Sequence, residues 1–159
     1  GLVHRATLIR SPSTEPRAAK RIISARTSLE VRRLMRLVVE TGTGKNAAAE
    51  GYVVGGKTGT ADKPANGGYR RRSLISSFIG AFPMQAPRYV VLALLDEPQG
   101  NKATHGYATG GWVAAPIVKR VVARVAPLLG VRPVDETAPE LHQVLDINLN
   151  REGRQLASY

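Results

Sequence analysis

The chain has 159 residues, of which 43% are hydrophobic, so one folded domain is expected and a disordered chain is excluded. No apolar run reaches the roughly 18 residues that a membrane-spanning helix needs, and the first residues lack the long apolar region of a signal peptide. There is no cysteine, which excludes disulfides and thiol chemistry but assigns no compartment.

The formal net charge of +11 is concentrated in the first 130 residues, since residues 131–159 contain five acidic residues against three arginines. A surface this basic favours anionic partners such as nucleic acid, lipid headgroups or acidic substrates. The simpler alternative is a solvated basic face. The three arginines at 70–72, beside Tyr69, allow two similar interpretations: a nucleic-acid patch, or a basic loop beside a binding groove.

The N-terminal half of the chain predicts one helix and one strand. Residues 1–20 have weak periodicity and two prolines, which indicates a strand remnant followed by a loop. A helix is predicted over 27–40, because Thr27 and Glu30 fit a capping box and apolar residues recur at helical spacing. After it, a flexible glycine-rich loop at 42–45 leads into a strand at 52–54.

The middle of the chain predicts a strand pair. Residues 61–73 are rich in turn-forming and basic residues and are expected to be irregular. Strands are predicted at 76–82 and 89–95, and their short connection favours an antiparallel hairpin. The second strand is apolar at nearly every position, which predicts a central strand covered on both faces.

The C-terminal part predicts a second helix and a tail. The helix is expected over 112–129, with Trp112 as a core anchor at its start. The patterning weakens after Gly130. Residues 131–159 are therefore predicted to form a loosely structured tail, with at most a short helix near 141–147.

The sequence Lys57-Thr58-Gly59-Thr60 is the strongest candidate site. On an edge strand, free backbone groups can pair with an added peptide strand, and Gly59 removes a side chain where another backbone comes close. Thr58 offers a hydroxyl to a carboxylate, and Lys57 offers a fixed positive charge. The backbone N–H of Thr60 offers a donor to a developing oxyanion. The alternative is a glycine-rich strand end with an incidental lysine.

This run is also the Lys-Thr-Gly box of the penicillin-recognising serine transpeptidases. Over roughly residues 20–130 the chain resembles class B penicillin-binding proteins, and among them the cell-division transpeptidases that build septal peptidoglycan. Ordered motifs carry the resemblance: residues 30–45, Gly51-Tyr52 through Ala61, Ser77 through Pro83, Leu95 through Pro98, Gly106 through Trp112, and Ala114-Ala115-Pro116.

The resemblance implies a role for each residue of the box. Lys57 is expected to hydrogen-bond the serine of a Ser-x-Asn motif and to support proton transfer. Thr58 is expected to hold the terminal carboxylate of the donor peptide or of a β-lactam, and Gly59 to permit close approach. The Thr60 N–H is expected to form half of the oxyanion hole. Lys57 and Thr60 are thus the expected catalytic residues, and Thr58, Gly59 and Thr60 the substrate-binding ones.

The resemblance further implies an α+β fold of the β-lactamase and transpeptidase type, an antiparallel sheet flanked by helices. Of the family's five strands, the chain is expected to supply the last three and the C-terminal helix. The Lys57 strand should lie at the edge and the Tyr89 strand near the centre. Residues 1–130 are then the C-terminal portion of a penicillin-binding transpeptidase domain, and residues 131–159 the tail.

The family's chemistry requires a serine followed three residues later by lysine, and also a Ser-x-Asn motif; the sequence contains neither. The chain alone is therefore expected to be inactive and to be completed by the upstream half of the domain. The implied ligands are peptidoglycan stem peptides and β-lactams, and the implied partners are division-machinery membrane proteins. The implied location is the periplasmic side of the inner membrane, with the anchor outside this chain. No cofactor, metal or specific nucleic acid is implied.

Two other functions stay open: a non-catalytic basic binding module for nucleic acid or anionic surfaces, and a sensor on the same scaffold without a nucleophile. Ser-x-x-Lys and Ser-x-Asn motifs upstream of Gly1 would favour the enzyme, whereas an initiating Met close to Gly1 would favour the others. A phosphate-binding loop at 42–45 fails on spacing, because Val39 stands where that motif needs glycine and Asn46 where it needs serine or threonine.

Overall fold

The computed structural model describes residues 1–8, 19–65 and 68–147, and the chain divides into two compact units, Gly1–Val31 and Arg32–Tyr159. In the first unit, strand β1 (Leu2–His4) pairs antiparallel with β2 (Ala19–Arg21). Helix α1 (Ala25–Glu40) begins in the first unit and continues into the second. Its first turn is capped by Ser24, whose Oγ accepts the Thr27 N–H at 2.9 Å, so the helix starts two residues before the expected capping box.

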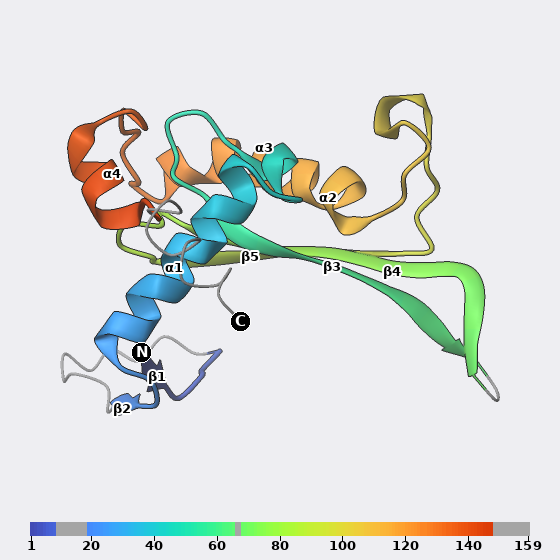
Figure 1. Cartoon of the computed structure of the whole chain (residues 1–159), viewed down its shortest axis with the longest axis horizontal. Helices are drawn as coiled ribbons and strands as arrows, with labels where there is room; N and C mark the ends of the chain where they lie inside the picture. Colours follow the sequence, from blue (N-terminus) through green and yellow to red (C-terminus); the bar gives the residue numbers. More distant parts are fainter. Residues whose placement is uncertain (9–18, 66–67, 148–159) are drawn as a thin grey trace, which may run out of the picture. The chain divides into compact units, whose positions relative to one another are not determined.

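The second unit is built on a three-stranded antiparallel sheet. Its strands are β3 (Gly55–Ala65), β4 (Gly68–Phe82) and β5 (Tyr89–Asp96), in the order β3-β4-β5. Figure 1 shows α2 (Gly110–Val113) and α3 (Ala115–Leu128) on one side of this sheet, with the far end of the β3–β4 hairpin extending beyond them. The prediction of an α+β fold with an antiparallel sheet and helices is therefore confirmed.

The main core lies between the sheet and α3. Phe78, Phe82 and Ala93 from the strands are buried with Val118 and Val122 from the helix. These helix residues recur at a spacing of four, which places them on one face of α3. The single helix expected over 112–129 is thus two helices that meet at Ala114, and the first of them already begins at Gly110.

Two predictions of local structure differ from the fold: a stretch expected to be irregular lies in strands, and a stretch expected to be a strand lies outside the sheet. Residues 61–73 are expected to be irregular, yet the described ones, 61–65 and 68–73, belong to the long strands β3 and β4, in which cross-strand hydrogen bonding outweighs the local turn signals. Conversely, Tyr52, Val53 and Val54 are buried but lie before β3, and only Tyr52 takes part in an isolated bridge, with Ala49. The loop after α1 contains a short 3-10 helix, η1 (Lys45–Ala47), and a second, η2 (Lys102–Thr104), follows β5.

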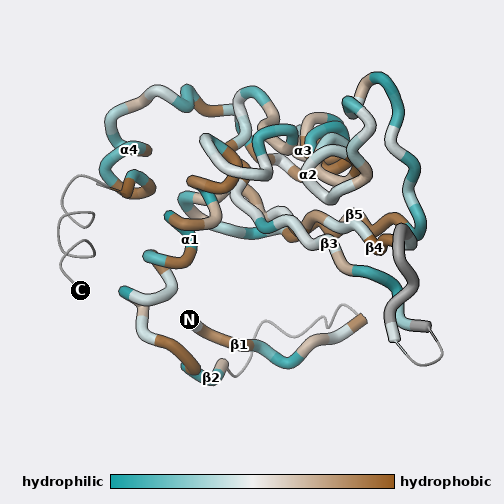
Figure 2. The backbone as a smooth tube through the Cα atoms, turned by 45° about the vertical axis from the view of Figure 1, so that its right-hand side comes forward, coloured by the Kyte–Doolittle hydropathy of each residue, from teal (hydrophilic) through white to brown (hydrophobic). Residues whose placement is uncertain are grey.

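Among the described residues, strand β5 pairs with β4 alone and is an edge strand, so its central place in a five-stranded sheet covered on both faces stays a prediction for the whole domain. Its exposure alternates: Ala93 is buried, whereas Val90, Leu92 and Leu94 are 66%, 60% and 59% exposed. Figure 2 shows hydrophobic stretches of the sheet, in brown, below α2 and α3. An apolar run predicts two covered faces, but α2 and α3 cover one face only, and pairing stops at β4.

Residues 131–147 are more firmly held than the loosely structured tail that we expected. Val131 and Leu145 are buried, and the short helix α4 (Pro139–Leu145) packs Leu145 into a second core cluster with Val53, Ala81 and Met84. The rest of the expected tail, 148–159, lies outside the described residues. A domain boundary after residue 130 stays a proposal.

Candidate active site

The Lys57-Thr58-Gly59-Thr60 run lies on β3, which forms one edge of the sheet, as the sequence predicts. Lys57 is opposite Ile79 of β4, and Ile79 is opposite Leu92 of β5. Directly opposed residues share a face of the sheet, so Lys57 stands on the face that carries the exposed aliphatic residues. Lys57 is itself exposed, and its Nζ donates to the carbonyl oxygen of Thr58 at 2.8 Å.

The two threonine side chains of the run lie on the other face, next to the helices. The Thr58 hydroxyl is 3.0 Å from the Thr43 hydroxyl, in a hydrogen bond that either group can donate. The Thr60 hydroxyl oxygen accepts the backbone N–H of Gly110 at 3.1 Å. Both hydroxyls are therefore oriented by neighbouring groups and are not free rotors on the surface.

Gly110 allows the start of α2 to approach the strands closely, and Gly59 leaves space on the opposite face. A Cβ on Gly110 would overlap the Ser77 carbonyl oxygen and would lie 2.6 Å from that of Gly59. A Cβ on Gly59 would lie 2.6 Å from Ser77 Oγ, on the face that Lys57 occupies. Only a residue without a side chain fits at Gly110, because its neighbours there are backbone atoms that cannot move aside.

The loop before α2 is fixed to the sheet by polar contacts. The buried Ser76 hydroxyl donates to the carbonyl oxygen of Ala108 at 2.6 Å, and Asn46 Nδ2 donates to that of Gly111 at 2.9 Å. Sequence reasoning missed Thr43, Gly110 and Ser76 as parts of this site. Thr43 and Gly110 lie inside the family-like motifs, which was the available signal, whereas Ser76 lies just before one. The contacts of Thr43 with Thr58 and of Gly110 with Thr60 arise only when β3, the loop after α1 and α2 come together.

The prediction that Trp112 is a core anchor can also be compared with the structure. Trp112 is partly buried, and it stacks with Tyr107 at 5.6 Å and meets His105 edge-on at 5.2 Å, so it belongs to a surface aromatic group and not to the deep core. Asp96 and Glu97 bind Lys63. Hydrogen bonds to these two carboxylates raise the pKa of Lys63.

The described part of the chain has no group of three or more His, Asp or Glu side chains placed to hold a metal ion. Within the same residues, no helix is long and apolar enough to cross a membrane. Of the predicted site residues, the structure brings Lys57, Thr58, Gly59 and Thr60 together on one strand; their catalytic and binding roles stay predictions.

Comparison with known proteins agrees with this strand and its motifs. The family model described as penicillin binding protein transpeptidase domain matches residues 4–123. The chain belongs to this family. Its membership confirms the resemblance to penicillin-binding proteins that the sequence motifs indicate.

Two curated relatives illustrate the match. The probable peptidoglycan D,D-transpeptidase FtsI of Caulobacter vibrioides is 46% identical over 130 residues, which are 76% of this chain and 22% of that protein. The stage V sporulation protein D of Bacillus subtilis is 46% identical over 118 residues, 74% of this chain and 18% of that protein. The chain thus spans about a fifth of the length of these relatives.

Solved structures share the fold. The transpeptidase domain of penicillin-binding protein 3 from Burkholderia pseudomallei superposes with a TM-score of 0.73 at 37% identity, covering 85% of this chain and 40% of that one. Penicillin-binding protein 3 of Mycobacterium tuberculosis in complex with ampicillin gives 0.65 at 31% identity, covering 86% and 31%. These neighbours support the β-lactamase-like fold class for the chain.

Proposed function

We propose that the chain is the Lys-Thr-Gly part of a serine D,D-transpeptidase that cross-links peptidoglycan stem peptides. The observation that carries this proposal is the exposed edge strand β3, which presents Lys57 together with two oriented hydroxyls in a member of the penicillin-binding family. An edge strand with free backbone groups is suited to binding an extended peptide by strand addition.

In the proposed reaction, a serine hydroxyl attacks the carbonyl carbon of the D-Ala-D-Ala peptide bond, and the terminal D-Ala leaves with a proton on its nitrogen. An amine of a neighbouring stem then attacks the acyl-enzyme, and the serine regains its proton. Lys57 supports the proton transfers, and the Thr60 N–H stabilises the oxyanion of each tetrahedral intermediate. The sequence has no serine with lysine three residues later, so the nucleophile comes from outside this chain.

The hydrogen bonds of the two threonines support their role toward the substrate carboxylate. Because Thr60 Oγ1 already accepts the Gly110 N–H, its own hydroxyl proton is available to donate to an anion. Thr43 can play the same part for Thr58 by donating to it. Two hydroxyl donors on one face of a short strand suit a terminal carboxylate, which accepts hydrogen bonds. The Lys57 side chain lies on the opposite face, so it contributes a nearby positive charge and not a third donor.

The opposite edge of the sheet supports completion of the domain by the upstream half. Strand β5 has no partner on its outer side among the described residues, and Val90, Leu92 and Leu94 lie exposed in a row on one face. An uncovered edge of this kind pairs readily with another strand. The upstream half supplies that strand together with the Ser-x-x-Lys and Ser-x-Asn motifs.

The names of the relatives support a wider setting for this reaction. We infer a septal role, binding of penicillin, contacts with membrane proteins of the division machinery, and a position on the periplasmic face of the inner membrane. The anchor is not in the described residues, since no helix among them could cross a membrane. A basic module for nucleic acid remains the competing function, and its distinguishing property is tight binding at physiological salt.

One experiment separates these functions. The chain alone and the whole domain that contains it are incubated with a labelled penicillin, and protein masses are measured. We expect one covalent adduct per whole domain and none on the isolated chain. An adduct on the isolated chain means that a nucleophile has been overlooked, and a whole domain that forms no adduct contradicts the proposed enzyme. Binding of a DNA oligonucleotide at physiological salt, in the same samples, would favour the competing module.

A further inference from the structure

Arg36 is the one charged residue among the described residues that is buried, at 9% exposure. Its guanidinium uses all three nitrogens. Nε donates to Glu40 at 2.6 Å, Nη2 donates to Glu136 at 2.8 Å, and Nη1 donates to the buried carbonyl oxygen of Val54 at 3.1 Å. A buried guanidinium tolerates its desolvation only when such partners remain in place, because each charge compensates the others.

The third of these contacts leads directly to the candidate site. Val54 precedes Gly55, the first residue of β3, and Lys57 follows three residues after Val54. Gly55 is also close to α1, since a Cβ there would lie 3.1 Å from the backbone nitrogen of Arg36. The backbone at the beginning of β3 is therefore held against α1 by the Arg36 side chain, and no side chain of the Lys57-Thr58-Gly59-Thr60 run takes part.

Glu136 ties the same stretch to the C-terminal part of the chain. Its Oε2 accepts from Arg36, while its Oε1 accepts the backbone N–H of Gly51 at 3.1 Å. The N–H of Val134 in turn donates to the Gly51 carbonyl oxygen at 2.9 Å. One carboxylate thus holds both ends of the segment 51–54, directly at Gly51 and through Arg36 at Val54.

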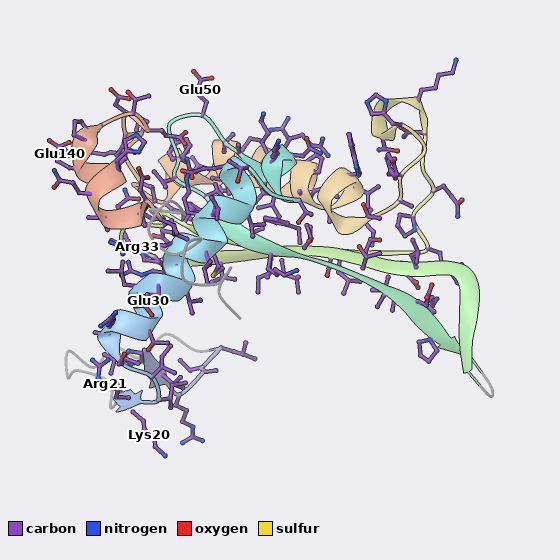
Figure 3. All side chains as sticks on the ribbon, in the orientation of Figure 1. Lys20, Arg21, Glu30, Arg33, Glu50 and Glu140 are labelled. Carbon is purple, nitrogen blue, oxygen red and sulfur yellow. The ribbon has the colours of Figure 1, made fainter. Side chains whose placement is uncertain are left out.

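The residues around Glu136 are themselves anchored. We call residues 131–147 the strap. Leu145 at the end of α4 is buried beside Val53 and Met84, and Arg33 Nε donates to the carbonyl oxygen of Val144 at 2.8 Å. In Figure 3, Arg33 lies on α1 beside α4, whereas Glu140 points away from the body. The family model ends its match at residue 123, so the strap lies beyond the matched region.

We propose that the strap positions the Lys-Thr-Gly strand, with Glu136 and Arg36 as positioning residues that act through the Val54 carbonyl. This inference rests on the proposed function of β3. Neutralising Glu136 leaves Arg36 without one of its two anionic partners, and the guanidinium then turns toward Glu40 or water and releases Val54. The first residues of β3 then become mobile, and the Lys57 ammonium and the Thr60 N–H are no longer held at the positions that the substrate requires. Misplacement on the scale of 1 Å costs up to about a hundredfold in rate.

The first test uses the full chain and requires no enzyme activity. Hydrogen exchange is followed at the backbone amides of residues 51–60 and, as an internal reference, of 118–122 in α3. We expect Glu136→Gln to speed exchange in 51–60 about tenfold and to leave α3 unchanged, because the opening is local. Glu140→Gln is the matched control, a substitution of the same kind on the same segment at an exposed position. Equal exchange in the two variants overturns the proposal.

A second variant guards against a general loss of fold. Arg36→Lys keeps the positive charge but replaces the three-way fork with one point donor, which cannot reach Glu40, Glu136 and Val54 together. We expect it to exchange like Glu136→Gln in 51–60. If exchange rises equally in α3 in both variants, Glu136 and Arg36 are general stability residues and the positioning role is contradicted.

The third measurement uses the whole domain and penicillin acylation. Glu136→Gln should lower the acylation rate about ten- to a hundredfold with little change in melting, and Glu140→Gln should leave the rate unchanged. A wild-type domain that fails to acylate contradicts the proposed function while leaving the exchange result intact. If the wild-type domain is acylated normally and the Glu136→Gln variant is acylated at the same rate, the positioning role of the strap is contradicted.

Discussion

The two edges of the sheet differ in chemistry although they belong to one small structure. At the β3 edge, the Lys57-Thr58-Gly59-Thr60 run combines a glycine, two hydroxyls with polar partners and the exposed charge of Lys57. At the β5 edge, three large aliphatic side chains are exposed in alternation, and the strand has no polar side chain between its terminal residues Tyr89 and Asp96. A polar, oriented edge suits a ligand that comes and goes, whereas an aliphatic edge suits a permanent cover.

The largest effect should come from β5, and its size should depend on whether the cover is present. Leu92→Ala should change the stability of the isolated chain by less than about 0.5 kcal/mol, because the side chain is already exposed. In the whole domain the same substitution should cost about 2–5 kcal/mol, the usual cost of truncating a buried leucine. Chemical denaturation of both proteins measures the difference.

If Leu92→Ala lowers the free energy of unfolding equally in the two proteins, the upstream half does not cover β5, and the proposed contrast between the two edges is contradicted. Light scattering coupled to size exclusion gives a second reading, since an uncovered β5 edge should make the isolated chain associate. A cooperatively melting monomer of residues 1–159 would show that the sheet needs no further strand, and the interpretation as part of a larger domain would be withdrawn.

The next effect concerns Lys57 at the other edge. Lys57→Ala in the whole domain should lower penicillin acylation about a hundredfold or more, as removal of one transition-state donor does, while the melting temperature stays the same. Lys45→Ala, an exposed lysine of η1, is the matched control. Stopped-flow measurements give the acylation rates of the two variants, and thermal melting gives their stabilities. A Lys57→Ala acylation rate within threefold of wild type would contradict the proposed role of Lys57.

A smaller effect separates packing from ligand access at Gly59. Gly59→Ala brings a Cβ to 2.6 Å from Ser77 Oγ, but to 3.9 Å from Ser77 Cβ. The Ser77→Ala change should therefore remove any strain, and the double variant should melt like wild type. If Gly59 serves ligand approach, acylation should still fall about tenfold in the double variant, because a methyl group remains where a backbone must come close. Recovery of the rate would show that Gly59 matters for packing alone.

The smallest effect is a pH dependence at the far end of the β3–β4 hairpin. Hydrogen bonds to Asp96 and then Glu97 raise the pKa of Lys63 above its ordinary value of 10.5, so the ammonium form is favoured by folding. Its contribution is present below pH 10.5 and is lost as the pH rises through the higher folded-state pKa. The difference in melting temperature between wild type and Lys63→Met should be constant from pH 7 to 9 and vanish in strong alkali. A difference that persists there would contradict the ion pair.

Much of the site could be read from the sequence because its residues are contiguous. Lys57, Thr58, Gly59 and Thr60 form one motif, and their place on an edge strand followed from glycine content and family resemblance. The orienting partners Thr43 and Gly110 could not be read in the same way. They lie 15 and 50 residues from the threonines that they contact, and no local pattern encodes such pairings.

The sequence by itself determined the class of the fold, the helix and strand content of the core, and the family, because these depend on periodicity and on ordered motifs. Only the tertiary structure decided which faces are covered. An apolar run such as β5 records that its residues avoid water, but it does not say which element covers each face, so one face is exposed in this chain. The same holds for Glu136 and Arg36. Their charges are visible in the sequence, yet burial and a shared carbonyl turn them into a fixed link to the Lys-Thr-Gly strand.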